Sequence, residues 1–249
     1  MWDPLIGAMR QWLRMIGRAS PGARVLERDG VTASVVPAAP EHAVVNSVLY
    51  ADAEGLAAVY DHLAAAYAEA GAAWMVWVPS TDDEARVALE RDGHVLDLTL
   101  PVMAVDLEGI ERPPADALED WTAKGDLREI GPLNDRAYAF ETDSFRRAFA
   151  NTPEDALRAY VARVDGRAAG CLTVTDHDGN ADVESVAVVP EARGRGISGK
   201  LLGHALADAR ERGLETSTLV ATDLGRPVYE RLGYREFGTV GMWVRQRPT

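Results

Sequence analysis

The stretch from Val183 to Ala207 constrains the fold more than any other part of the chain. It begins as an apolar run, VESVAVVP, continues through the turn EARGRGISG and ends in KLLGHALA, which has helical periodicity. A strand that leads into a helix through glycines leaves backbone N–H groups unpaired at the helix start, and such groups bind phosphate or pyrophosphate. The sequence therefore predicts an anion site between a buried strand and a helix.

Two general phosphate-binding patterns fit the letters of this turn but fail on a further requirement. Residues 194–199 read G-x-G-x-x-G, the dinucleotide fingerprint. That fold needs its first glycine directly after the strand and several more βαβ units, whereas residues 190–193 intervene here and few elements are predicted to follow. The P-loop needs a serine or threonine after its lysine to bind magnesium, and Leu201 stands at that place. A nucleotide-binding protein is therefore kept only as an alternative.

A third pattern agrees with both the letters and their context. The segment VxPEARGRGIS after a strand resembles motif A of the GNAT N-acetyltransferase superfamily, [R/Q]-x-x-G-x-[G/A]. Arg193, Gly196 and Ser198 stand at the three defined places, with serine where glycine or alanine is usual. The segment VYERLGY at 228–234 resembles motif B of the same superfamily. The resemblance covers residues 118–249 well and the first half of the chain only in outline.

The resemblance implies that acetyl-CoA is the co-substrate and lies in a cleft where the central strand diverges from the strand at 216–221. Glycines let a diphosphate approach the backbone closely, and the strand at 186–188 can offer free backbone groups to the pantetheine amides. The expected cofactor-binding residues are Val186, Ala187, Val188, Arg193, Gly194, Arg195, Gly196, Ile197, Ser198 and Gly199. No metal is expected, because His177 and His204 have no partners at metal-ligand spacing.

Catalytic roles follow from the same resemblance. Tyr229 occupies the place of a tyrosine general acid that protonates the departing thiolate, and a backbone N–H near Val188 is the expected oxyanion donor. Asp182 and Glu184 alternate onto one face of the central strand, and either could accept the amine proton. A carboxylate on an apolar strand must be paired or solvated, which favours Glu184 as the catalytic base. Asp182 is expected to reach solvent at the strand end.

The chain is predicted to contain two domains, at 1–110 and 111–249, joined by a proline-containing linker at 107–117. The segments ERDGH at 90–94 and ERLGY at 230–234 share three identities, and each follows a predicted strand and short helix. We therefore expect an α/β (α+β) fold of two GNAT-like domains, each a mixed, mostly antiparallel sheet flanked by helices. Only the second has the glycine-rich turn and splayed central strand. The first has Leu89 in place of Tyr229, so we interpret it as a degenerate copy.

Local patterns predict the remaining elements. Apolar residues at helical spacing over residues 5–16 indicate an amphipathic N-terminal helix. The other expectations are hairpins at Asp29-Gly30 and Asp165-Gly166, a capping box of Thr81 and Glu84, strand pairs within 95–106 and 234–245, a helical region at 133–149 and a helix start at 151–154.

Composition limits the partners and the compartment. A net charge of -13 argues against general affinity for nucleic acid or anionic membranes. The single cysteine, Cys171, fits a reducing compartment. The chain has no apolar run of membrane-spanning length, and Arg10 and Arg14 interrupt the N-terminal apolar segment in a way that signal peptides avoid. A cytoplasmic protein is expected, as a monomer or a homodimer.

The leading functional hypothesis is an acetyl-CoA-dependent N-acetyltransferase, an acyltransferase that moves acetyl to a small-molecule or peptide amine by direct attack in a ternary complex. The alternative is a catalytically weak acyl-CoA-binding regulatory module. Acceptor residues are expected within 133–149, where Asp135, Tyr138, Glu141 and Asp143 either attract an amine or form a solvated face.

Overall fold

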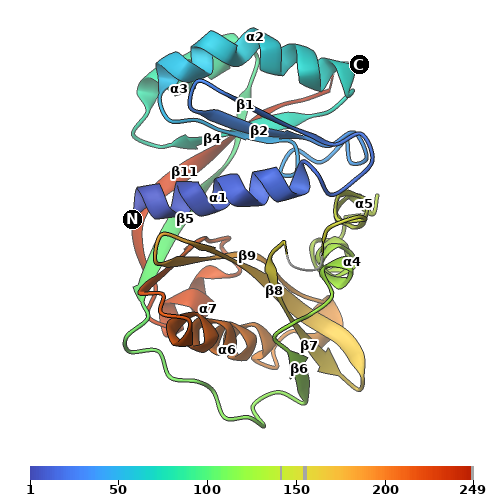
Figure 1. Ribbon diagram of the computed structural model, residues 1–249, viewed down its shortest axis with the longest axis vertical. Coiled ribbons are helices and arrows are strands. Elements are labelled where there is room, and N and C mark those ends of the chain that lie inside the picture. Colours follow the sequence, from blue (N-terminus) through green and yellow to red (C-terminus); the bar gives the residue numbers. More distant parts are fainter. Residues whose placement is uncertain (141, 154–155, 248–249) are drawn as a thin grey trace.

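A computed structural model describes residues 1–140, 142–153 and 156–247. Its described strands form one sheet in the order β1-β2-β3-β4-β11-β5-β10-β9-β8-β7-β6. Figure 1 shows α2 and α3 at one end of the molecule, α6 and α7 at the other, and α1 lying across the middle. The elements in chain order are α1 (Trp2–Ile16), β1 (Arg24–Arg28), β2 (Val31–Val35), β3 (Ser47–Leu49), α2 (Ala53–Glu69), β4 (Trp74–Pro79), α3 (Asp83–Arg91), β5 (Val95–Asp106), β6 (Asp120–Thr122), α4 (Leu127–Tyr138), α5 (Ser144–Ala148), β7 (Arg158–Val164), β8 (Arg167–His177), β9 (Asn180–Val188), the 3₁₀ turn η1 (Pro190–Ala192), α6 (Ile197–Glu211), β10 (Thr216–Val220), α7 (Arg226–Arg231) and β11 (Arg235–Arg245).

Local signals account for several of these elements. The N-terminal helix buries the predicted apolar face, and both hairpins form at the expected Asp-Gly turns. Helix α6 ends before Gly213, whose φ of 88° is the left-handed conformation that glycine adopts readily. The capping box is wrong, because the carboxylate of Asp82 caps α3 by accepting from the N–H of Ala85. The helical region at 133–149 divides into α4 and α5, and the helix start predicted at 151–154 lies partly outside the described residues.

Two long strands join the halves of the chain. Each predicted strand pair is in fact a single strand, β5 with 12 residues and β11 with 11. Neither segment contains an Asp-Gly or Asn-Gly turn, and Gly238 marks a register shift in the pairing with β5 instead of a hairpin. The strand β11 lies between β4 and β5, and β5 lies between β11 and β10. One sheet therefore contains strands from both predicted domains, 1–110 and 111–249.

The order of elements is the same around both helices that cover the two ends of the sheet. The first half runs β3-α2-β4-α3-β5 and the second runs β9-α6-β10-α7-β11. In both, the two strands that flank the longer helix are parallel to each other. The starts of α2 and α6 differ. The Asp52 carboxylate caps α2 by accepting from the N–H of Gly55, so it already occupies the place at which a bound phosphate would lie. The interpretation of the first half as a degenerate copy stays a prediction.

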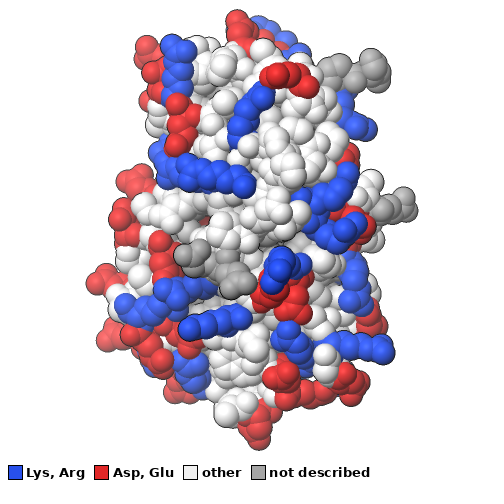
Figure 2. Space-filling model, turned by 45° about the vertical axis from the view of Figure 1, so that its right-hand side comes forward, with Lys and Arg blue, Asp and Glu red and all other residues white. Residues whose placement is uncertain are grey.

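Charged side chains of both signs are interspersed on the face shown in Figure 2. Ion pairs connect separate elements, as where Arg212, the C-cap residue of α6, contacts Asp176 of β8 at 2.8 Å. No helix in the described part of the chain is long and apolar enough to cross a membrane. Within 1–140, 142–153 and 156–247 there is also no cluster of three or more His, Cys, Asp or Glu residues that could hold a metal ion.

Candidate active site

The central strand β9 diverges from its neighbour β10 after a short parallel contact. Only residues 180–182 pair with residues 216–218. The register between β8 and β9 also shifts beyond Thr173, and Ser185 has a φ of 53°, so β9 carries a bulge at this point. The predicted splay is therefore present, and two cavities open beside it.

The smaller cavity, of about 200 Å³, lies at the glycine-rich turn. It brings together eight of the ten predicted cofactor-binding residues: Val186, Ala187, Val188, Arg193, Gly194, Gly196, Ile197 and Ser198. Arg195 is outside the lining and its guanidinium contacts Glu119 at 2.6 Å. Gly199 is also outside it, on the α6 side that faces Val228. The prediction missed other lining residues, which include Thr222, Leu224, Gly225 and Val228.

Backbone conformation explains why glycines occupy the turn. Gly194 and Gly196 have φ values of 77° and 74°, in the left-handed region that side chains disfavour. Gly196 is the N-cap of α6 and provides no side-chain cap, so the first N–H groups of the helix keep their hydrogen-bonding capacity. Arg193 holds the turn in place, because its Nε donates to the Val188 carbonyl at 3.2 Å and its Nη2 to the Ala137 carbonyl at 2.5 Å.

The backbone of β9 offers an N–H to the cleft at the position expected for an oxyanion donor. The N–H of Val189 donates to the carbonyl of Ala169 on β8 at 2.9 Å. Successive residues of an antiparallel strand direct their N–H groups to opposite sides. The N–H of Val188 therefore faces away from β8, on the side where β10 has diverged.

The larger cavity, of about 610 Å³, lies between the two halves of the chain. Its lining comes from α1, the loop at 41–44, β4, β5 and β11 as well as from α4, α5 and β9. Four residues line both cavities: Tyr138, Val186, Thr222 and Tyr229. The two spaces therefore meet beside Tyr229.

Tyr229 lies on α7 with only 6% of its surface exposed. Its ring lies over Gly225, where a Cβ would be only 2.7 Å from Cε2 and 2.9 Å from the hydroxyl oxygen. Burial, with a smaller contribution from Tyr138, raises the pKa of Tyr229 above its usual value. The hydroxyl therefore stays protonated at neutral pH, as a proton donor must.

Asp182 and Glu184 form a buried carboxyl pair. The expectation that Asp182 reaches solvent is wrong: it is 1% exposed and accepts a hydrogen bond from Thr218 Oγ1 at 2.9 Å. Thr175 Oγ1 donates to Glu184 Oε2 at 3.0 Å, and the two carboxyl groups are within hydrogen-bonding reach of each other. Burial raises the pKa of Asp182 to about 8, and burial together with the neighbouring Asp182 raises the pKa of Glu184. Both residues line the larger cavity, and the pair retains a proton near neutrality.

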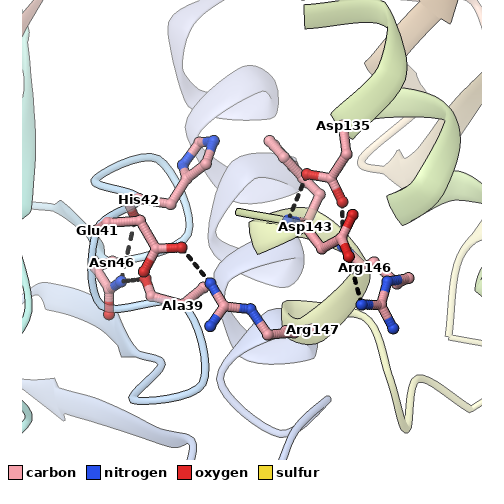
Figure 3. A network of polar contacts seen from close by, with 9 residues as sticks. Ala39, Glu41, His42, Asn46, Asp135, Asp143, Arg146 and Arg147 are labelled. Atoms are coloured by element: carbon pink, nitrogen blue, oxygen red, sulfur yellow. Dashed lines mark hydrogen bonds and ion pairs between the residues drawn. The ribbon is translucent and has the colours of Figure 1, made fainter. Parts of the chain in front are cut away.

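Of the predicted acceptor residues, Tyr138 lines both cavities and donates to the Val186 carbonyl at 2.9 Å. Figure 3 shows the neighbouring polar network. Asp135 is not available to an acceptor, because its carboxylate accepts from the N–H groups of Phe145 and Arg146 at the start of α5. Asp143 pairs with the Arg146 guanidinium at 2.5 Å. Glu141 lies outside the described residues.

The same network joins the halves next to the larger cavity. Glu41, from the first half, forms an ion pair with Arg147 of α5. The adjacent His42 packs edge-on against Phe140 and Phe145, each at 4.6 Å between ring centroids. Burial lowers the pKa of His42 to about 4, so this wall of the cavity is neutral and largely aromatic. Sequence reasoning missed this contribution, because residues 41 and 42 belong to the half without the glycine-rich turn.

Comparisons with known proteins show what this fold resembles. Residues 118–234 match the model of the Acetyltransferase (GNAT) family. The chain therefore carries a GNAT acetyltransferase domain over these residues. A search of curated proteins finds no match.

Solved structures resemble the chain over nearly its whole length. A GCN5-related N-acetyltransferase from Kribbella flavida has a TM-score of 0.67 at 18% identity, covering 98% of this chain and 96% of that one. A GCN5-related N-acetyltransferase from Sphaerobacter thermophilus has a TM-score of 0.61 at 17% identity, covering 98% and 95%. A GCN5-related glucosamine N-acetyltransferase region of a fungal GH3 β-N-acetylglucosaminidase has a TM-score of 0.58 at 16% identity, covering 98% and 36%. These similarities establish a fold that includes the first half of the chain.

Proposed function

We propose that this protein is an N-acetyltransferase that moves acetyl from acetyl-CoA to a primary amine by direct attack in a ternary complex. The observation that carries the proposal is the meeting of two cavities beside Tyr229 at the splay of β9. One cavity is bounded by the glycine-rich helix start and the other by a carboxyl pair. Donor and acceptor thus have separate spaces with one shared boundary, as direct transfer requires.

The smaller cavity has the chemistry to hold acetyl-CoA as a co-substrate. The uncapped start of α6 and the left-handed glycines provide N–H groups for the diphosphate. The edge of β9 at 186–188 provides its remaining backbone groups for the amides of pantetheine, since the carbonyls of Val186 and Val188 already accept from Tyr138 and Arg193. We propose the ten predicted cofactor-binding residues as the contacts to acetyl-CoA, with Arg195 and Gly199 at the edge of this group.

The residues around the shared boundary can complete the transfer. The Glu184–Asp182 pair accepts a proton from the ammonium form of the acceptor, and the nitrogen of the neutral amine then attacks the carbonyl carbon of the thioester. The N–H of Val188 stabilises the oxyanion of the tetrahedral intermediate. When the carbon–sulfur bond breaks, Tyr229 gives its proton to the thiolate of CoA, and the proton that the attacking nitrogen loses as the amide forms restores the phenol. Glu184 and Tyr229 are accordingly the proposed base and acid.

The role proposed for the first half is to close the acceptor space. It has no glycine-rich turn, and Asp52 occupies its corresponding helix start. It nevertheless lines the larger cavity through α1, the loop at 41–44, β4 and β5. We infer a degenerate GNAT-like domain, at 1–110, that serves the catalytic domain at 111–249.

The phenolic proton of Tyr229 distinguishes an enzyme from an acyl-CoA-binding regulatory module. In a screen of amines with acetyl-CoA, read by release of free thiol, Tyr229→Phe should lower kcat by about 100-fold or more and leave acetyl-CoA affinity unchanged. Tyr234→Phe is the matched control, because its ring lies 6.0 Å from Tyr229 and its hydroxyl contacts Ser217 outside both cavities. Unchanged turnover in Tyr229→Phe removes the acid role. Binding of acetyl-CoA without thiol release for any amine supports the regulatory module.

A further inference from the structure

The lining of the larger cavity points to a class of acceptor. We propose that the acceptor is a primary amine that carries a bulky apolar group, such as an aromatic ring, and no anionic group. This inference rests on the proposed function, because it names the substrate of the same site.

The walls of the cavity are apolar on both sides. One wall is apolar and is formed by residues of β4, β5 and β11 together with one residue of the loop at 41–44: Trp77, Leu98, Leu100, Met242, Val244 and Val44. Trp12 of α1 and the rings of Phe140 and Phe145 contribute to the remainder. An apolar enclosure of this extent favours an acceptor that buries apolar surface of its own.

The charges around the cavity have one sign. Its described lining includes no Lys or Arg, and its acidic residues are Glu41, Asp97 and the carboxyl pair Asp182 and Glu184. Glu41 is paired with Arg147, and Asp97 lies on the exposed end of β5. A carboxylate or phosphate on the acceptor would lose water in this cavity without gaining a cationic partner, which is unfavourable. An ammonium group instead meets the carboxyl pair Asp182 and Glu184.

The carboxyl pair and the apolar wall would contact different parts of one acceptor molecule. The pair Asp182 and Glu184 lines the larger cavity on the same strand as Val186, which lines both cavities, so the amine is placed at the end of the larger cavity formed by β9. The apolar wall around Trp77 and Leu100 lies on the strands of the other half, so the apolar group extends toward the first half. The cavity volume of about 610 Å³ is in the range that holds a whole small molecule.

Amines that differ in one group test this assignment. Steady-state thiol release with the full chain and acetyl-CoA compares 2-phenylethylamine with phenylalanine, which differ only by the carboxylate, and both with spermidine and glucosamine. We expect kcat/KM for 2-phenylethylamine to exceed that for phenylalanine by about 100-fold or more, and to exceed those for the two hydrophilic amines. Equal or better use of phenylalanine, spermidine or glucosamine overturns the inference and leaves the acetyltransferase function intact.

A charge placed in the wall provides a second test. Leu98→Arg brings a guanidinium to the cavity, and Leu98 is already 49% exposed, so the chain tolerates the change. The control is Val95→Arg on the same strand, 69% exposed and outside the lining. Leu98→Arg should reduce the preference for 2-phenylethylamine over phenylalanine by about tenfold, and Val95→Arg should not. An unchanged preference in Leu98→Arg contradicts the assignment.

Direct binding separates failure of the inference from failure of the proposed function. Calorimetric titration of 2-phenylethylamine and of phenylalanine into the chain saturated with CoA, which has no acetyl group to transfer, measures preference without turnover. Tighter binding of 2-phenylethylamine with no thiol release for any amine supports the acceptor class and rejects the transferase. Tighter binding of phenylalanine rejects the acceptor class.

Discussion

Gly225 lies against the ring of Tyr229, and Gly225→Ala should impair turnover by displacing the hydroxyl of that ring. Gly225 has φ and ψ of -80° and -35°, which alanine adopts without strain. The added Cβ would stand 2.7 Å from Cε2 and 2.9 Å from the hydroxyl oxygen of Tyr229, whereas ordinary contacts begin at 3.4 Å. The ring must therefore move by about 0.5 to 0.7 Å. Since a displacement of about 1 Å can cost about 100-fold in rate, we expect kcat to fall about tenfold.

The assay combines thiol release with calorimetric titration of acetyl-CoA. Gly225→Ala is compared with Tyr229→Phe and with the double variant, and Gly109→Ala is the control because nothing lies within 4 Å of its Cβ position. Once the phenol is absent, moving the ring has no further effect on proton donation, so the double variant should match Tyr229→Phe. Two results would refute the reasoning: the same factor lost in both backgrounds, or weaker acetyl-CoA binding with an unchanged kcat.

Three further predictions concern pH dependence and assembly. The pKa of Asp182 rises from 3.8 to about 8 on folding, so the free energy of unfolding should decrease as the pH is raised from 3.8 to about 8, by at most about 1.4 kcal/mol per pH unit for one proton. Asp182→Asn should flatten this decrease in denaturant titrations, and an unchanged slope contradicts the burial argument. Burial lowers the pKa of His42 and of His94 from 6.5 to about 4, so NMR titration should show both rings neutral above pH 5 and stability should fall as pH drops through this range; a midpoint near 6.5 for either ring counts against it. Residues 111–249 alone lack β5, the partner of both β10 and β11, and should fail to unfold cooperatively by circular dichroism unless 1–110 is supplied; a stable isolated half would show that β5 is dispensable.

Much of the lining of the smaller cavity could be predicted because its determinants are local. A left-handed glycine, a helix start and the strand before it are adjacent in sequence, so the segment 186–198 supplies most of the predicted residues that line this cavity. The position of Tyr229 required only one additional motif, on a helix that follows the next strand. Arg195 departs from the prediction because Glu119, distant in sequence, engages its side chain.

The pairing of the strands was harder to predict from the sequence, because it depends on contacts between distant segments. Each half lacks a turn inside its last strand, yet periodicity alone cannot show that β11 pairs with β4 and β5. The burial of Asp182 has the same origin, since its partner Thr218 comes from β10. The acceptor cavity depends on the pairing of β11 and on the burial of Asp182. Its residues Trp77, Leu100 and Met242 meet only where β4, β11 and β5 lie side by side.

Calorimetric titration of acetyl-CoA into the full chain tests the central claim, that the glycine-rich turn at the splay of β9 binds this co-substrate. One acetyl-CoA should bind per chain, ATP and NAD should bind at least about tenfold more weakly, and Gly196→Asp should abolish binding by straining the turn and adding a negative charge. Undiminished binding to Gly196→Asp, a second acetyl-CoA per chain, or a preference for ATP or NAD would contradict the account.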